Sequence, residues 1–142
     1  MHLAERELLL AARRDARPVG QAGRAEIDLA DFANAPFILL KKGRGIRRMA
    51  DRLFEKSGFQ PLIAYETSSY NMALGLAAQG LGCTFVIDHE MRLPENMAAY
   101  HILGAEETYQ LHLVCRKDIY LTRPFQYFIE LARRIDRREA LE

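Results

Sequence analysis

The stretch that decides the fold spans residues 36–87 and reads PFILLKKGRGIRRMADRLFEKSGFQPLIAYETSSYNMALGLAAQGLGCTFVI. Three apolar runs in it, residues 36–40, 62–65 and 82–87, are bounded by turn residues and predict buried strands. Two segments with other patterns separate these runs. An alternation of strands and helices predicts right-handed crossovers and a mostly parallel sheet that is covered on its faces.

The first intervening segment is predicted to be an amphipathic helix that begins at Ile46 and stops at Gly58. The second, from about residue 70 to 79, has hydroxyl side chains before it as N-caps and Gly80 after it as a stop. Because this second helix is apolar nearly all round, we expect it between two packed layers.

Outward from this stretch, residues 7–12 predict a strand without a preceding helix or an evident partner, so we expect it to join a sheet completed elsewhere. Residues 28–32 resemble one helical turn. Downstream, residues 99–103 and 109–116 predict two more strands. A last helix is predicted to begin near Thr122 and to bury apolar residues at helical spacing, namely Phe125, Phe128, Ile129, Ala132 and Ile135.

The composition describes one globular domain. The chain has 142 residues, of which 49% are hydrophobic and 27% are charged. These values exclude a disordered chain, and two cysteines are too few for a disulfide scaffold. A net charge of +1 gives no overall attraction to nucleic acid or anionic lipid. No apolar run approaches the roughly 20 residues of a membrane span, and the start lacks a signal-peptide pattern. We expect a cytoplasmic protein without a membrane partner.

Residues for enzyme chemistry are not evident in the sequence, because it has no nucleophile beside a base and no clustered metal ligands. Its four histidines lack metal-binding spacing, so we expect no metal site; they are His2, His89, His101 and His112. We also expect no catalytic residues and no cofactor.

Two other features could still carry chemistry. Cys83 and Cys115 lie in apolar runs without a C-x-x-C pair, and we expect both to be buried core thiols. Asp88 and Glu90 flank His89 just after a predicted strand, where catalytic residues gather in α/β folds. A polar turn is the simpler interpretation of these three residues.

Lys41, Lys42, Gly43 and Arg44 occupy the first strand-to-helix turn. Free backbone N–H groups at a helix start favour an anion, so this turn could bind a carboxylate or a phosphate. The turn lacks the spacing of a nucleotide-binding loop, and a plain glycine turn is the alternative.

Thr67, Ser68 and Ser69 occupy the corresponding position before the second helix. Ligands of open α/β sheets bind at such edges. Helix capping is the structural alternative, but it needs one hydroxyl group rather than three. We therefore expect at least one of the three to contact a ligand.

Several of these segments, taken in order, resemble the effector-binding domain of LysR-type transcriptional regulators. The resemblance extends from about Glu7 to Ile135. It is carried by IDLADF, PFI, RRMADRLFEKSGFQP, ET, LAAQGLGCTFV and RKDIYLT, at residues 27–32, 36–38, 47–61, 66–67, 76–86 and 116–122.

The resemblance implies an α/β fold of the periplasmic-binding-protein type 2-like class, in which two subdomains enclose a small effector. This chain would form mostly one subdomain, at about residues 26–104. The crossing segments and the final helix of the other subdomain would lie at about residues 5–14 and 108–136. The family's amino-terminal helix-turn-helix is absent from this chain, so we expect a fragment or a truncated member.

The resemblance also implies a function without catalysis. A small metabolite that could carry a negative charge would bind at Lys41, Lys42, Gly43, Arg44 and at Thr67, Ser68, Ser69, and would switch DNA binding of a homo-oligomeric parent protein. DNA would be contacted only through the absent helix-turn-helix.

Two other functions remain open. One is an enzyme or solute-binding module on the same fold, which would be favoured if Asp88, Glu90 or Cys83 faced Thr67. The other is a self-association module that works through an incomplete sheet edge.

Overall fold

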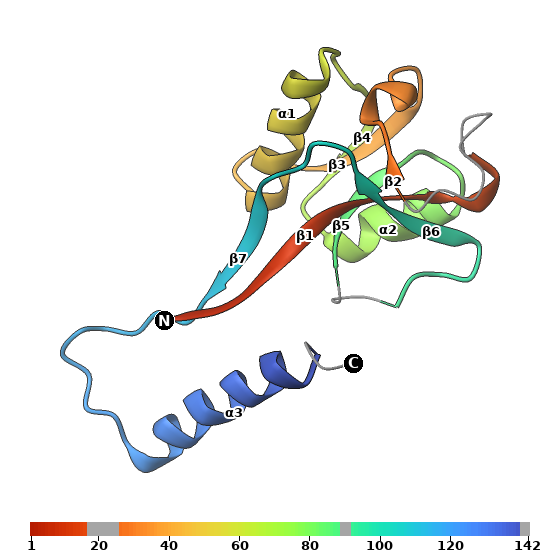
Figure 1. Cartoon of the computed structure of the whole chain (residues 1–142). Coiled ribbons are helices and arrows are strands. Elements are labelled where there is room, and N and C mark those ends of the chain that lie inside the picture. Colours follow the sequence, from red (N-terminus) through yellow and green to blue (C-terminus); the bar gives the residue numbers. More distant parts are fainter. Residues whose placement is uncertain (17–25, 89–91, 140–142) are drawn as a thin grey trace. The chain divides into compact units, whose positions relative to one another are not determined.

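The computed structural model describes residues 1–16, 26–88 and 92–139 (Figure 1). The chain divides into two compact units. The larger unit comprises Glu7–Tyr109, and the smaller comprises Met1–Arg6 with Gln110–Glu142. Strands β1 (His2–Arg13) and β7 (Thr108–His112) pair with each other, and each continues from one unit into the other.

The larger unit contains a mixed sheet. Its strands run in the order β2-β6-β1-β5, and a parallel bridge between Phe37 and Cys83 joins β5 to the pair β3-β4. Strand β1 is antiparallel to β5 and β6, whereas β2 and β6 are parallel, as are β3 and β4. The expected mostly parallel α/β sheet is confirmed, with β1 as the antiparallel member. The other strands are β2 (Glu26–Ile27), β3 (Pro36–Leu40), β4 (Leu62–Thr67), β5 (Thr84–Ile87) and β6 (Met97–Ile102).

The expectation that the first strand lacks a partner in this chain is wrong. Leu8 pairs with Ile87 of β5, and Leu10 pairs with both Phe85 and Tyr100. A strand between two neighbours in a covered sheet is apolar on both faces, and the run from Leu8 to Ala12 is buried throughout. Its partners lie far downstream in sequence, where local patterns do not reveal them.

Successive residues of β1 and β3 enter two different cores, because side chains alternate across a sheet. Phe37 and Leu39 pack on one face with Met49 and Phe54 of helix α1 (Gly45–Ser57). The opposite core contains Ile38, Leu40 and the buried side of helix α2 (Tyr70–Ala78). The helical turn after Asp28, η2 (Leu29–Phe32), lies on the α1 face. One further turn, η1 (Arg14–Ala16), follows β1.

Both helices of the larger unit follow the sequence prediction in extent. Helix α1 ends at Gly58, whose φ of 78° suits glycine, and Ser69 caps α2 by accepting from the Met72 amide. However, α2 does not lie between two packed layers. Only one of its sides meets the sheet, and Met72 on the other side is 51% exposed. Small side chains let α2 pack closely against the sheet on one side, and its other side remains exposed.

In the smaller unit, the first residues pair with the segment after β7. The Met1 amino group donates to the Leu113 carbonyl at 2.9 Å, and the Leu113 amide donates to the Met1 carbonyl at 2.8 Å. Strand β7 ends at His112, earlier than predicted. Cys115 therefore lies beyond the strand and is exposed, so the expectation of a buried thiol is wrong for this residue.

Helix α3 (Arg123–Glu139) begins where the sequence predicts. Its expected apolar face is only partly covered, because Phe125, Ile129 and Ala132 are half-buried and Phe128 is 51% exposed. The smaller unit supplies few residues that could cover this face. None of the helices in the described ranges is long and apolar enough to cross a bilayer.

Candidate functional site

The candidate site lies in the larger unit, where β3, β4 and β5 end and helices α1 and α2 begin. A cavity of about 290 Å³ opens there. Ligands of parallel sheets bind outside the carboxyl ends of strands, so this is the expected edge. The cavity is lined by Leu40, Arg44, Gly45, Ile46, Ser68, Tyr70, Ile87 and Tyr109.

The turn after β3 presents groups suited to an anion. Gly43 adopts a φ of 95°, which glycine allows at little cost, and the chain then enters α1 with Arg44 as the N-cap residue. No side chain caps this helix. The first amides of α1 therefore remain available at the positive end of the helix dipole. The exposed Arg44 guanidinium has no ion pair or hydrogen bond within the described residues.

Arg47, one turn further along α1, has the opposite role. Its side chain is buried and donates to Asp51 Oδ1 at 2.9 Å, to the Leu40 carbonyl at 3.0 Å and to Glu66 Oε1 at 3.1 Å. Burial alone would lower the pKa of Arg47, but the hydrogen bonds and charges of Asp51 and Glu66 raise it above the ordinary value. Arg47 thus joins β3, α1 and β4.

Two of the three hydroxyl groups before α2 serve the local backbone. The buried Thr67 Oγ1 accepts from the Ser69 amide at 3.1 Å, and Ser69 Oγ accepts from the Met72 amide at 3.2 Å. Ser68 is exposed, lines the cavity and has no partner in the part of the chain that the structure describes. The three hydroxyls therefore divide into two structural groups and one available group.

Two tyrosines complete the cavity, and neither was identified from sequence. The Tyr70 hydroxyl accepts from the Ile87 amide at 2.9 Å, which fixes the ring between α2 and β5. The Tyr109 hydroxyl has no hydrogen-bond partner among the described residues. Its ring lies against the start of α1, where Cε2 would be 3.4 Å from a Cβ atom added to Gly45.

Of the seven residues expected to bind a ligand, Arg44 and Ser68 line the cavity. Lys42 instead lines a separate groove with Arg47 and Asp51. The remaining four, Lys41, Gly43, Thr67 and Ser69, belong to the two turns but not to the cavity lining. Tyr109 was missed because it comes from a distant strand, and only the fold brings it to this edge.

Cys83, one of the residues that could favour catalysis, lies away from this edge. The backbone of Cys83 forms hydrogen bonds with Pro36 and Ile38, near the amino end of β3. The Thr67 carbonyl accepts from the Lys41 amide just past the other end of β3, on the order of 10 Å away. Burial raises the pKa of Cys83 to about 11, so its thiol stays protonated at neutral pH. Asp88 follows β5, and its amide donates to the Glu7 carbonyl.

The other residues of that turn, His89 and Glu90, lie outside the described residues. Among the residues that are described, no group of three or more His, Cys, Asp or Glu side chains could hold a metal ion.

One known protein family matches most of the chain. The family described as LysR substrate binding domain matches residues 1–136. The uncharacterized HTH-type transcriptional regulator YcgK of Bacillus subtilis (strain 168) is 37% identical over 100 residues. That match covers 70% of this chain and 31% of the relative. The chain thus spans about a third of the length of this curated relative.

Solved structures with similar folds include two ligand complexes. The effector-binding domain of QuiR in complex with shikimate has a TM-score of 0.75 at 20% identity, covering 97% of this chain and 65% of that one. The Synechocystis PCC6803 CcmR regulatory domain in complex with 2-PG has a TM-score of 0.78 at 19% identity. That second match covers 96% of this chain and 65% of the other. At these identities the two structures establish the fold.

Proposed function

Because the chain belongs to the LysR substrate-binding domain family, we propose that it senses a small anionic metabolite for a DNA-binding transcriptional regulator. The ligand would bind in the cavity where β3, β4 and β5 end. Binding would shift the population of conformations of the parent protein and so alter its binding to DNA.

The observation that carries this proposal is the set of unpartnered polar groups around the cavity. Arg44, Ser68 and Tyr109 have no side-chain partner in the described ranges, whereas the Thr67 and Ser69 hydroxyls each accept a hydrogen bond from the backbone. A binding site needs a few convergent polar groups that the fold itself does not use.

The chemistry of the lining supports a carboxylate or phosphate attached to an apolar body. Arg44 and the uncapped start of α1 favour a negative charge. The rest of the lining is apolar or aromatic, with Leu40, Ile46 and Ile87 beside the tyrosines. We propose that Arg44 and Ser68 are the principal contacts, and that Lys41, Lys42, Gly43, Thr67 and Ser69 shape or support the site.

We propose that the larger unit corresponds to the distal subdomain, and that β1, β7 and α3 correspond to the crossing segments and final helix of the other. The protein would bind and release its ligand without a chemical step. A regulator that acts on bacterial DNA works in the cytoplasm, and we propose that location for the parent protein.

Self-association is supported by the edge strand β4, which pairs only with β3 in the described sheet. Leu62, Ile63 and Tyr65 on it are 60%, 39% and 51% exposed, and unpaired apolar edges favour association. We propose that the parent is a homo-oligomer. Light scattering on the chain and on the variant Ile63→Lys tests this: a concentrated monomer in both samples would contradict it.

The function is tested by thermal unfolding of the 142-residue chain with four probes: shikimate, benzoate, acetate and inorganic phosphate. We expect at least one anion to raise the melting temperature, because a ligand at about 100 times its Kd stabilises the folded state by about 2.7 kcal/mol. Arg44→Gln should weaken that anion about tenfold, as expected for loss of a charge-assisted hydrogen bond.

Arg48→Gln is the matched control, since Arg48 is exposed on the same helix and lies outside the cavity. Its anion affinity should equal that of the unmodified chain. An equal loss of anion affinity in both variants would assign the effect to the net charge of the chain. The absence of any stabilisation by the four anions would contradict the proposal.

A further inference from the structure

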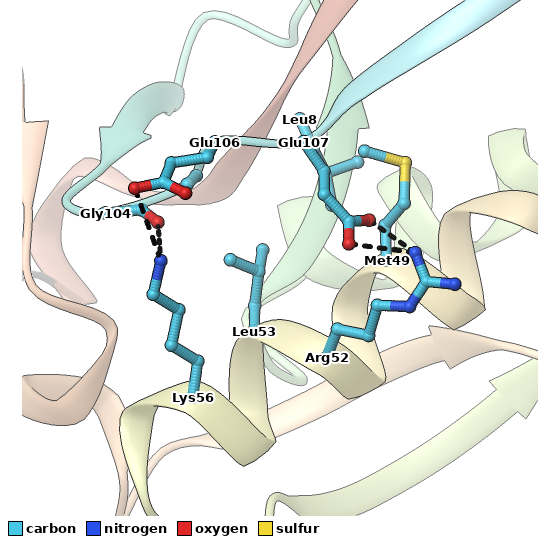
Figure 2. Close-up of a pocket in the computed structure, with 9 residues that line it drawn as sticks. Leu8, Met49, Arg52, Leu53, Lys56, Gly104, Glu106 and Glu107 are labelled. Atoms are coloured by element: carbon cyan, nitrogen blue, oxygen red, sulfur yellow. Dashed lines mark hydrogen bonds and ion pairs between the residues drawn. The ribbon is translucent and has the colours of Figure 1, made fainter.

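A second hollow, of about 120 Å³, lies between α1 and the segment that connects β6 to β7 (Figure 2). All of its residues belong to the larger unit, and none lines the candidate site. One side of α1, with residues spaced at i, i+3, i+4 and i+7, forms one wall. The lining residues are Leu8, Met49, Arg52, Leu53, Lys56, Gly104, Ala105, Glu106 and Glu107.

The inner surface of this hollow is apolar. Leu8 of β1 and Met49 of α1 are 1% and 9% exposed and belong to the main core. Leu53 and Ala105 pack against the same core from opposite walls. Figure 2 shows Leu53 between the side chains of Arg52 and Lys56. An occupant would therefore meet hydrocarbon on its inner side.

The rim carries two cations and two carboxylates. Arg52 Nη1 donates to both carboxylate oxygens of Glu107, at 2.8 and 2.7 Å. Lys56 Nζ donates to the Gly104 carbonyl at 2.6 Å and lies 3.9 Å from Glu106. These pairs are exposed, so they contribute little to stability and can open.

The rim favours a neutral ligand over a charged one. An anion would have to compete with Glu106 and Glu107, and a cation would have to compete with Arg52 and Lys56. A neutral acceptor needs only an unused N–H group. Arg52 Nε and Nη2 have no acceptor within the described residues.

The size of the hollow limits the apolar part of the ligand to about one ring, since an apolar cavity of roughly 150 Å³ holds benzene. We propose that this hollow is a second binding site, for a small neutral ring compound that carries one hydrogen-bond acceptor.

The second site shares two elements with the candidate site. Helix α1 lines the candidate site at Gly45 and Ile46, and it lines the hollow from Met49 to Lys56. The segment after Gly104 forms the opposite wall of the hollow, and two residues beyond Glu107 it reaches Tyr109 of the candidate site. A ligand that separates α1 from this segment therefore moves Tyr109. This coupling rests on the proposed function, whereas the second site itself does not.

The test measures binding of benzyl alcohol to the full 142-residue chain by NMR of its methyl groups. We expect saturable shifts at the methyl groups of Leu8, Met49 and Leu53. Leu53→Trp fills the hollow and should weaken benzyl alcohol at least tenfold. Leu81→Trp, at an exposed position after α2, is the matched control and should bind benzyl alcohol like the unmodified chain. Benzoate should bind at least tenfold more weakly than benzyl alcohol, as measured at the same methyl groups.

If Leu53→Trp does not fold, Ala105→Leu fills the hollow from the opposite wall and should give the same loss. No saturable shift, or equal binding by the filled and control variants, would overturn the second site, whatever the four anions do at the candidate site.

Fluorotyrosine labelling tests the coupling separately. Benzyl alcohol should shift the Tyr109 signal, assigned through Tyr109→Phe, while the exposed Tyr127 of the smaller unit stays unchanged. Saturable binding of benzyl alcohol in the hollow with an unchanged Tyr109 signal would overturn the coupling.

Discussion

The two ends of strand β3 differ in packing and in the charge of the residues around them. At the amino end, Phe37 is fully buried, and its ring lies 4.9 Å from that of Phe54 and 6.1 Å from that of Phe85. At the carboxyl end, within five residues, the chain presents two lysines, a glycine with positive φ and an arginine without a partner among the described residues. One short strand thus packs among aromatic rings near its amino end and leads into a polar turn beside a cavity at its carboxyl end.

This difference separates polar groups that the fold uses from those it leaves available. Arg44 and Arg47 lie three residues apart at the start of α1, yet Arg47 is buried with three hydrogen bonds and Arg44 is exposed. Residue type alone does not distinguish them. The number of partners does, and this difference supports the proposed binding site at the carboxyl end of β3.

The largest effect is expected at the packed end, from Gly82→Ala. A Cβ atom at Gly82 would lie 2.6 Å from the carbonyl oxygen of Pro36, and backbone on both sides must shift to accept it. We expect a loss of about 3 kcal/mol in the free energy of unfolding, measured in urea. Gly75→Ala is the control, because Gly75 lies in α2 with open space around it and should gain up to about 1 kcal/mol. Similar values for the two variants would contradict the close packing of this end.

The next effect concerns pH and the thiol of Cys83 at the same end. Burial raises its pKa to about 11, so between about pH 9 and pH 11 the unfolded chain has lost a proton that the folded chain still holds. Stability should therefore fall as pH rises through this range, by up to about 1.4 kcal/mol per pH unit.

Urea unfolding of the unmodified chain, Cys83→Ala and Cys115→Ala at several alkaline pH values measures this contribution. Cys83→Ala should reduce the slope against pH, and Cys115→Ala should leave it unchanged because that thiol is exposed. Equal slopes in all three proteins would contradict the burial of the Cys83 thiol.

The smallest effect sharpens the comparison at the polar end. Tyr70→Phe removes the acceptor of the Ile87 amide and should lower the free energy of unfolding by about 1 kcal/mol. Tyr109→Phe removes a hydroxyl without a partner in the described structure and should leave stability within about 0.5 kcal/mol. A larger stability loss for Tyr109→Phe than for Tyr70→Phe would reverse the proposed roles of the two tyrosines.

Local sequence patterns predicted most of the elements. The spacing from Ile46 to Phe54 and the stop at Gly58 located α1, and the cap at Ser69 located α2. The patterns could not find the partners of β1, since pairing depends on residues far apart in the chain. They also could not determine whether an apolar face is covered, as α2 and α3 demonstrate.

The candidate site was predictable as an edge but not as a set of contacts. A strand followed by a helix start located both turns, because free amides occur there in any such fold. The sequence could not say that Thr67 and Ser69 would bond the backbone while Ser68 would not. Tyr109 needed the tertiary structure, since β7 brings it to the start of α1.

The most direct test of the account is an NMR titration of the 142-residue chain with the anion that most stabilises it, read at assigned amide and methyl groups. The account predicts that the largest shifts lie at the polar end of β3, at Ile46, Ser68 and Ile87, while Phe37 and Phe85 at the packed end remain unchanged. Shifts concentrated at the packed end, or spread evenly over both ends, would contradict the claim that this protein binds its ligand where β3, β4 and β5 end.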